Sequence, residues 1–115
     1  MQNSTVEEFL EKVYCEFEKC VLERGVGYKS KFCKNLLKLF EEYEFSKVDT
    51  LSIQKVVCGV CDQLVSKAAK EGRIWSIDFE SWKGAVTGKM EENLGKWYLK
   101  QVLNHQQTPY SATQK

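Results

Sequence analysis

Proline and histidine are nearly absent from this sequence, which has one residue of each among 115. Pro109 lies close to the C-terminus, so no residue before it removes a backbone N–H group and breaks a helix. A long stretch without proline therefore favours a helical protein. The histidine, His105, lies in the polar C-terminal segment, which leaves Cys–His or Ser–His catalysis without a base near the core.

A surplus of charge is also lacking, because 17 Lys and Arg residues are balanced by 16 Asp and Glu residues and the formal net charge is +1. Proteins that bind nucleic acids usually need a basic surplus to displace counterions from phosphates, so binding of DNA or RNA is disfavoured. No segment has the roughly 18 consecutive apolar residues that indicate a transmembrane helix. We therefore expect no nucleic-acid partner and no transmembrane anchor.

The cysteines number five, and the polar, acidic N-terminus does not resemble a secretory leader. These features predict a cytoplasmic protein whose thiols fill the core, rather than a disulfide framework. The pair Cys58-Gly-Val-Cys61 would need two more ligands to hold zinc, and Cys33 and His105 do not have a paired spacing. The pair also lies inside a predicted helix, whereas a redox motif opens one. We expect no metal, no cofactor and no catalytic residues.

Length and composition indicate one soluble domain, because 115 residues with 43% apolar side chains support a single core and are too few for two. Apolar residues recur three or four positions apart along most of the chain, and no segment shows the strict alternation of a strand. We predict an all-α fold, a compact single-domain bundle of five to six helices over residues 1–104. A flexible polar tail, residues 105–115, is expected to follow.

The first predicted helix is amphipathic. Ser4 and Glu7 have the spacing of a capping box, and Gly25-Val26-Gly27 supplies a C-terminal stop. The apolar positions between them are Val6, Phe9, Leu10, Val13, Phe17, Cys20 and Val21.

The second predicted helix runs from about Tyr28 to Phe45 and is apolar over a wide arc. Such a helix must meet the core on one side and another element, a second subunit or a ligand helix on the other. Its apolar positions are Phe32, Leu36, Leu37, Leu39, Phe40 and Tyr43.

The third predicted helix is capped by Asp49 or Thr50 and ends at Gly72. Gly59 lies in its interior, where a glycine costs about 1 kcal/mol relative to alanine unless another element packs closely against it. We therefore predict that another helix approaches closely at Gly59.

A fourth predicted helix begins at a cap, either Ser76 or Asp78, and runs to about Asn93. Its apolar residues recur at intervals of four and are Trp82, Val86 and Met90. Gly95 interrupts the helix, and a further apolar set extends a last helix to about Asn104. The members of that set are Trp97, Val102 and Leu103.

Recognition of another protein is the function class that remains. Three tryptophans and a phenylalanine-rich second helix suit a groove that buries a partner's helix, because such grooves need large, rigid apolar walls. The alternative is that the tryptophans fill the core of a small bundle.

Three segments follow one another in the order of a known family. VEEFLEKVYCEFEKCVLERGVGY is an apolar-periodic helix that ends in Gly-Tyr, KFCKNLLKLFEEYEF follows it, and VDTLSIQKVVCGVCDQLVSKAAKEGRIW ends with Glu71-Gly72 and Trp75. This succession resembles the Bcl-2 family of apoptosis regulators, in particular its short viral members without an anchor, whose signature is Asp-Gly-x-x-Trp-Gly-Arg. Ser76-Ile77 stand where that signature has Gly-Arg, so Arg73 is the candidate substitute for its arginine. A rival register places Trp82-Lys83-Gly84 at the signature.

The resemblance implies an anti-apoptotic protein that sequesters pro-death ligand helices in a hydrophobic surface groove, in the host cell cytoplasm if the protein is viral. The partner would be the amphipathic helix of a pro-apoptotic protein, with Arg73 as the cation for its acidic residue. A charged substitution at Val60 would then abolish binding and leave the helical content intact. The implied groove walls are Phe32, Leu36, Phe40, Val57, Val60, Leu64, Trp75 and Phe79.

A helical homodimeric scaffold protein without catalytic activity is the competing hypothesis, with the wide apolar arc of the second helix as the contact between copies. Three responses distinguish the function classes. A nucleic-acid complex weakens steeply with ionic strength, a groove complex hardly responds to it, and a homodimer has a mass that depends on concentration.

Overall fold

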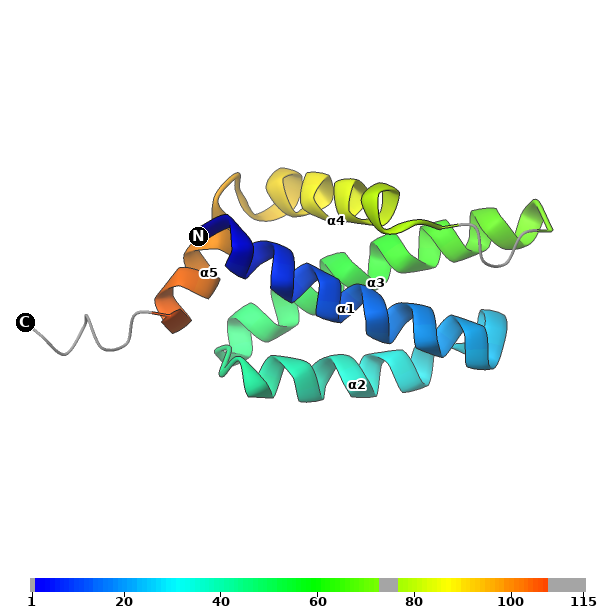
Figure 1. Cartoon of the computed structure of the whole chain (residues 1–115), viewed down its shortest axis with the longest axis horizontal. Coiled ribbons are helices and arrows are strands. Elements are labelled where there is room, and N and C mark those ends of the chain that lie inside the picture. Colours follow the sequence, from blue (N-terminus) through cyan, green and yellow to red (C-terminus); the bar gives the residue numbers. More distant parts are fainter. Residues whose placement is uncertain (1, 73–76, 108–115) are drawn as a thin grey trace, which may run out of the picture.

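The computed structural model describes residues 2–72 and 77–107, and Figure 1 shows their arrangement. Most of the described residues are helical and none lies in a strand, which confirms the predicted all-α fold and gives five α-helices. The elements are α1 (Gln2–Arg24), the short 3-10 helix η1 (Gly25–Gly27), α2 (Lys29–Glu42), α3 (Lys47–Lys70), α4 (Phe79–Leu94) and α5 (Tyr98–Gln107). None of these helices is long and apolar enough to cross a membrane.

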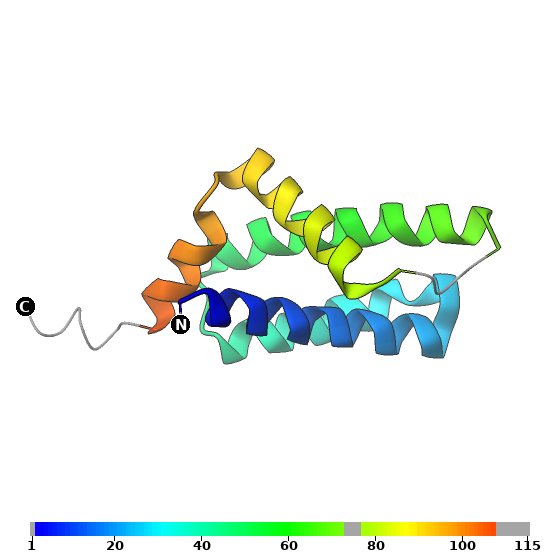
Figure 2. The ribbon, with the colours of Figure 1, turned by 45° about the horizontal axis from the view of Figure 1, so that its top comes forward.

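The first helix organises the bundle. Helix α1 packs against α2, α4 and α5, and α3 closes the far side by packing against both α2 and α4. Figures 1 and 2 show α1 and α2 lying side by side, with α5 across the beginning of α1. Because α1 touches three other helices, it has apolar residues on more than one side, and seven of them are buried or half-buried: Val6, Phe9, Leu10, Val13, Phe17, Cys20 and Val21.

Aromatic rings fill the centre of the core. Trp82 of α4 is fully buried, and its ring centroid lies 6.5 Å from that of Phe17 on α1. The Phe17 ring also lies 5.6 Å from the rings of Tyr28 and Phe32. Of the three tryptophans, Trp82 therefore fills the core, while Trp97 is 56% exposed. The third, Trp75, lies outside the described residues.

Two side chains begin their helices by capping them. The Asp78 carboxylate accepts a 2.8 Å hydrogen bond from the backbone N–H of Ser81, so Asp78 is the cap of α4, one of the two predicted candidates. The Ser46 hydroxyl accepts one of 3.0 Å from the backbone N–H of Asp49 and caps α3. The prediction that Asp49 or Thr50 caps this helix is wrong, because the helix begins at Lys47 and both residues lie in its first turns.

Other helix ends also differ from the predictions. Helix α1 begins at Gln2, so Ser4 lies inside the helix and does not cap it. Helix α2 ends at Glu42 rather than near Phe45, because Glu44 adopts a left-handed backbone conformation with φ of 57° and turns the chain toward α3. The last helix continues to Gln107, beyond the predicted end near Asn104.

The close approach predicted at Gly59 is absent. Gly59 is exposed on α3, and within the described residues no atom from another part of the chain lies within 4 Å of the position that a Cβ would occupy. The prediction is wrong because the interior of a helix tolerates an exposed glycine at a cost of about 1 kcal/mol, with no packing partner required.

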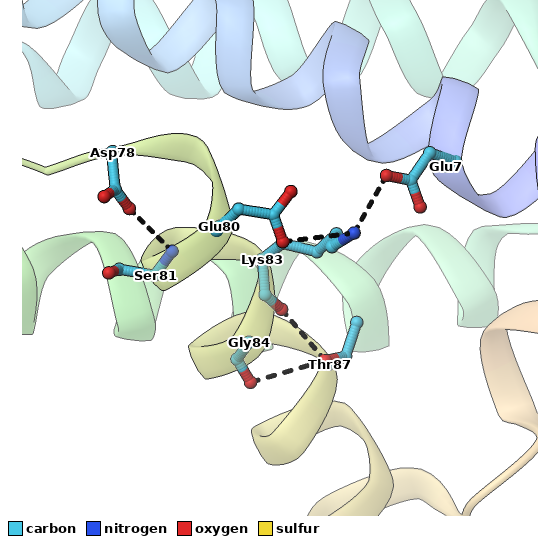
Figure 3. A network of polar contacts seen from close by, with 7 residues as sticks. All are labelled: Glu7, Asp78, Glu80, Ser81, Lys83, Gly84 and Thr87. Carbon is cyan, nitrogen blue, oxygen red and sulfur yellow. Dashed lines mark hydrogen bonds and ion pairs between the residues drawn. The ribbon is translucent and has the colours of Figure 1, made fainter.

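Polar contacts fix the beginning of α4 against α1 (Figure 3). The Lys83 ammonium lies 2.8 Å from a carboxylate oxygen of Glu7 on α1 and 3.6 Å from one of Glu80 in its own helix. One turn further along α4, the Thr87 hydroxyl donates to the Lys83 carbonyl at 2.9 Å. Only the ion pair between Lys83 and Glu7 crosses to α1, and together with the burial of Trp82 it fixes α4 to α1 by both polar and apolar interactions.

Candidate functional site

The predicted groove residues are gathered together, but in the interior of the protein. Five of them, which we call the inner seam, are at most 5% exposed: Phe32, Leu36 and Phe40 of α2 with Val57 and Val60 of α3. Leu64 and Phe79 are half-buried and pack against the same cluster. Arg73 and Trp75 lie outside the described residues.

The seam is closed because α2 lies between two other helices. Its wide apolar arc meets α1 on one side and α3 on the other. The Phe40 ring stacks on Phe9 of α1 with their centroids 6.0 Å apart, and Phe32 lies close to Phe17 of the same helix. The second side of this arc was predicted to meet another element, a second subunit or a ligand helix. The structure shows that it meets another element of the same chain. In this conformation the inner seam is core and not a surface trough.

A different apolar surface lies where α2 turns into α3. We call it the outer corner, and its exposed apolar side chains are Leu37 (42% exposed), Val48 (71%) and Leu51 (61%). Between the two helices is a shallow groove of about 460 Å³, which is lined by Leu37, Glu41, Phe45, Lys47, Thr50 and Leu51. Leu37 and Leu51 line this groove, and Val48 lies one helical turn before Leu51 on α3. Isolated exposed apolar residues are common on protein surfaces, but exposed leucines that line one groove indicate an interaction site.

The outer corner carries one charge of each sign. Glu41 of α2 and Lys47 of α3 both line the groove. Within the described part of the chain, neither side chain has an ion-pair partner. The groove therefore offers an acid and a base that are available to another molecule.

The sequence carries only a partial signal for this corner. Leu37 belongs to the wide arc of the second predicted helix, but nothing in the arc distinguishes it from its buried neighbour Leu36. Val48 and Leu51 stand on either side of Asp49 and Thr50, the two predicted caps of the third helix. Once the start of α3 is known, the spacing of three between Val48 and Leu51 indicates that they lie on the same side of this helix.

A second hollow, of about 310 Å³, lies between α1, α4 and α5. Its wall includes Trp97, whose indole ring is covered by two ammonium groups. Lys96 and Lys100 lie 5.5 Å and 5.2 Å from the ring centroid. Because these cation–π contacts already occupy the exposed aromatic face, this hollow is a weaker candidate for an apolar partner than the outer corner.

The main polar junction between α2 and α3 is centred on Asp62. Its carboxylate accepts a 2.9 Å hydrogen bond from the hydroxyl of buried Tyr28 and lies 2.8 Å from the ammonium of Lys29. The hydrogen bond from Lys29 and that from Tyr28 lower the pKa of Asp62 below its usual value. Burial and the bond to Asp62 raise the pKa of Tyr28. This junction holds the two helices together at the end of the pair away from the outer corner.

Metal binding has no support in the described residues, where no group of three or more His, Cys, Asp or Glu side chains could hold an ion. The pair Cys58 and Cys61 is divided between two environments. The Cys58 sulfur faces Cys33 of α2, whereas the Cys61 sulfur accepts a 3.3 Å hydrogen bond from the Trp82 indole.

Comparison with protein-family models, with curated proteins and with solved structures found no match to this chain. The resemblance to the Bcl-2 family therefore stays a prediction. Two regions bear on the function, namely the inner seam, which is buried, and the outer corner, which is exposed.

Proposed function

We propose that this protein is a non-catalytic interaction module that pairs with a second copy of itself through the outer corner. The observation that carries the proposal is that exposed Leu37 and Leu51 line a groove at the α2–α3 turn, with exposed Val48 one helical turn before Leu51. Removing such side chains from water on association is favourable by about 25 cal/mol for each Å² of apolar surface. The corner is therefore the part of the described surface best suited to an apolar contact.

A second copy fits this corner because its charges are self-complementary. In a symmetric dimer the same patch is used twice, so a residue that contacts a second residue across the interface is contacted by it in return. Glu41 of each copy can then pair with Lys47 of the other, so the symmetric dimer contains two such ion pairs. The formal net charge of +1 causes little repulsion between the copies.

The test is the mass of the protein in solution as a function of concentration. We expect the mass of the unmodified chain to rise toward that of two chains, and Leu51→Lys to keep the mass of one chain at the same concentrations. Leu22→Lys is the matched control, since Leu22 is 64% exposed but lies near the end of α1, outside the groove. An unmodified chain that stays monomeric throughout, or a Leu22→Lys variant that behaves as Leu51→Lys does, contradicts the proposal.

The charges provide a stricter test. Glu41→Lys and Lys47→Glu should each weaken the dimer, because each leaves two like charges facing one another across the interface. The double variant, which exchanges the two charges, should regain most of the lost association. Double substitution without recovery would mean that these two residues do not meet.

A second candidate function follows from the Bcl-2 resemblance, namely binding of a pro-apoptotic protein's amphipathic helix between α2, α3 and the start of α4. Its support is that the seven described groove residues come from these helices and gather in one apolar cluster. The ligand would have to separate α2 from α3 to reach the inner seam. Leu64 and Phe79, which are half-buried, would be contacted first.

Calorimetric titration with a panel of pro-apoptotic helix peptides tests this second candidate. Saturable heat with a one-to-one stoichiometry would support it, and a response at all concentrations equal to that of a scrambled peptide would rule it out. The dimer proposal survives either result, because it depends on the outer corner and not on the inner seam.

A further inference from the structure

Two of the five cysteines face one another across the α2–α3 contact. The sulfur atoms of Cys33 on α2 and Cys58 on α3 are 3.5 Å apart, and both residues are half-buried. A disulfide bond requires a separation of about 2.05 Å, so the two sulfur atoms would have to approach by about 1.5 Å. Side-chain rotation and a small helix adjustment supply movements of this size.

The surrounding contacts hold these two thiols in register. Lys29 lies four residues before Cys33 on α2, and Asp62 lies four residues after Cys58 on α3, so each is one helical turn from its cysteine. The ammonium of Lys29 lies 2.8 Å from the carboxylate of Asp62, which also accepts the hydrogen bond from Tyr28. The ion pair and the thiol pair are therefore neighbouring contacts, one helical turn apart, between α2 and α3.

We propose that Cys33 and Cys58 are a modification site at which a low-molecular-weight disulfide, such as oxidised glutathione, oxidises the two thiols to a reversible intramolecular disulfide. This bond covalently joins α2 to α3. The site does not depend on pairing between two copies. It differs from the metal and core-filling roles considered for these cysteines, because it requires two thiols from different helices.

The exchange is balanced in two steps. The thiolate of Cys33 attacks one sulfur of the oxidised reagent, the reagent's S–S bond breaks, and one reagent thiolate leaves. The Cys58 sulfur, after losing its proton, then attacks the mixed disulfide at the Cys33 sulfur, and the second reagent thiolate leaves. Two protein thiols are oxidised, one S–S bond is formed in the protein, and one molecule of reagent is reduced to two thiols.

The order of attack follows from the environment of Cys58. Burial and the neighbouring Cys33 raise the pKa of the Cys58 thiol to about 12. Only a thiolate attacks a disulfide, so Cys58 is poorly suited to the first step. It is well placed for the second step, because its sulfur already lies beside that of Cys33.

The other cysteines are less suited to an internal bond. Burial raises the pKa of Cys61, which is fully buried beside Trp82. Cys20 is also buried and has its pKa raised by burial. Cys15 is exposed, and we expect it to take up glutathione as a mixed disulfide that does not proceed to an internal bond.

The experiment treats the full chain with a series of glutathione redox buffers, traps the remaining thiols by alkylation and measures the intact mass. In the Cys15→Ser variant, we expect a product that has lost two hydrogen atoms and carries no glutathione. Trypsin should release Cys33 in peptide 32–34, joined to peptide 56–67, which contains both Cys58 and Cys61. The Cys61→Ser variant distinguishes these two, because the joined peptides should persist in it.

Matched variants complete the test. Cys33→Ser and Cys58→Ser should each abolish the joined peptides, and the oxidised Cys15→Ser chain should melt at least about 5 °C above its reduced form. Stable glutathione adducts on Cys33 with no joined peptide, or a bond between Cys58 and Cys61, would overturn the proposal. Leu51→Lys should oxidise as the unmodified chain does, so a failure of the dimer proposal and a failure of this one can be distinguished.

Discussion

The inner seam and the outer corner are formed by the same two helices, yet their apolar side chains have opposite surroundings. Leu36 and Leu37 are neighbours in sequence, but Leu36 is fully buried and Leu37 is 42% exposed. The difference arises because α1 covers one side of α2, while no described element covers the groove at the α2–α3 turn. The comparison shows that apolar character alone does not decide whether a residue belongs to the core or to a binding surface.

Substitution of Val60 by lysine should have the largest effect and would break the inner seam. Val60 is 5% exposed, so the ammonium would be placed in an apolar environment without a partner, and we expect a loss of about 3 kcal/mol or more in the free energy of unfolding. Lysine forms helices at least as readily as valine, so the loss would come from burial and not from propensity. Urea denaturation followed by circular dichroism measures it. The buried position changes the expectation that a charge at Val60 leaves the helical content intact.

Removal of the Asp62 carboxylate should have the second largest effect, at the end of the helix pair away from the corner. Asp62→Ala leaves the buried Tyr28 hydroxyl without its acceptor and separates Lys29 from its partner. We expect a loss of about 1.5 kcal/mol in the free energy of unfolding, near the lower end for bonds to charged groups because the Asp62 side chain is 44% exposed.

The same variant gives a pH signature. The pKa of Asp62 is lowered in the folded protein, so its contribution is present above the unfolded value of about 4 and is lost as the pH falls through the lowered folded value. The difference in stability between the unmodified chain and Asp62→Ala should therefore shrink as the pH falls from about 5 to 2. A difference that stays constant over this range would mean that the carboxylate is not the group responsible.

Gly59→Ala should have a smaller effect, and a stabilising one. Gly59 is exposed on α3 and a Cβ there meets no atom within 4 Å, so the substitution adds helix propensity without a clash. We expect a gain of about 1 kcal/mol in the free energy of unfolding, measured by the shift in the urea midpoint at an unchanged slope. Destabilisation would mean that another part of the chain packs against this position, which contradicts the open surroundings of Gly59.

Leu51→Lys should have the smallest effect on the stability of the monomer and sharpens the comparison with Val60→Lys most directly. The same side chain is introduced, but Leu51 is 61% exposed, so we expect a change within about 0.5 kcal/mol in samples dilute enough to be monomeric. The denaturation measurement used for Val60→Lys checks it. A large loss of stability at Leu51 would mean that the outer corner is part of the core.

The sequence predicts the helices better than it predicts their surroundings. Periodicity locates all five helices because it reflects one repeating property, and Asp78 was among the predicted caps. Ser46, Asp49 and Thr50 can all cap a helix, so their chemistry does not identify which one does. That choice depends on where the chain turns after α2, which the left-handed Glu44 decides.

The candidate site is less accessible to sequence analysis for a related reason. The residues of the inner seam are apolar at helical spacing, and this pattern fits a groove wall and a core equally well. Only the position of α1 over α2 separates these possibilities. The facing of Cys33 and Cys58 is likewise a contact between residues 25 positions apart, and their spacing along the chain carries no sign of it.

The place of α1 has a consequence for how this protein is made. Its apolar side chains require α2, α4 and α5 for cover, and α5 leaves the ribosome after all the other helices. Helices α1 and α2 can associate early, but the surface of α1 that receives α5 must stay uncovered until synthesis has passed Gln107. Nascent chains that stall before that point would present Val6, which lies beside residues of α4 and α5, to chaperones, and a slow last segment would favour aggregation.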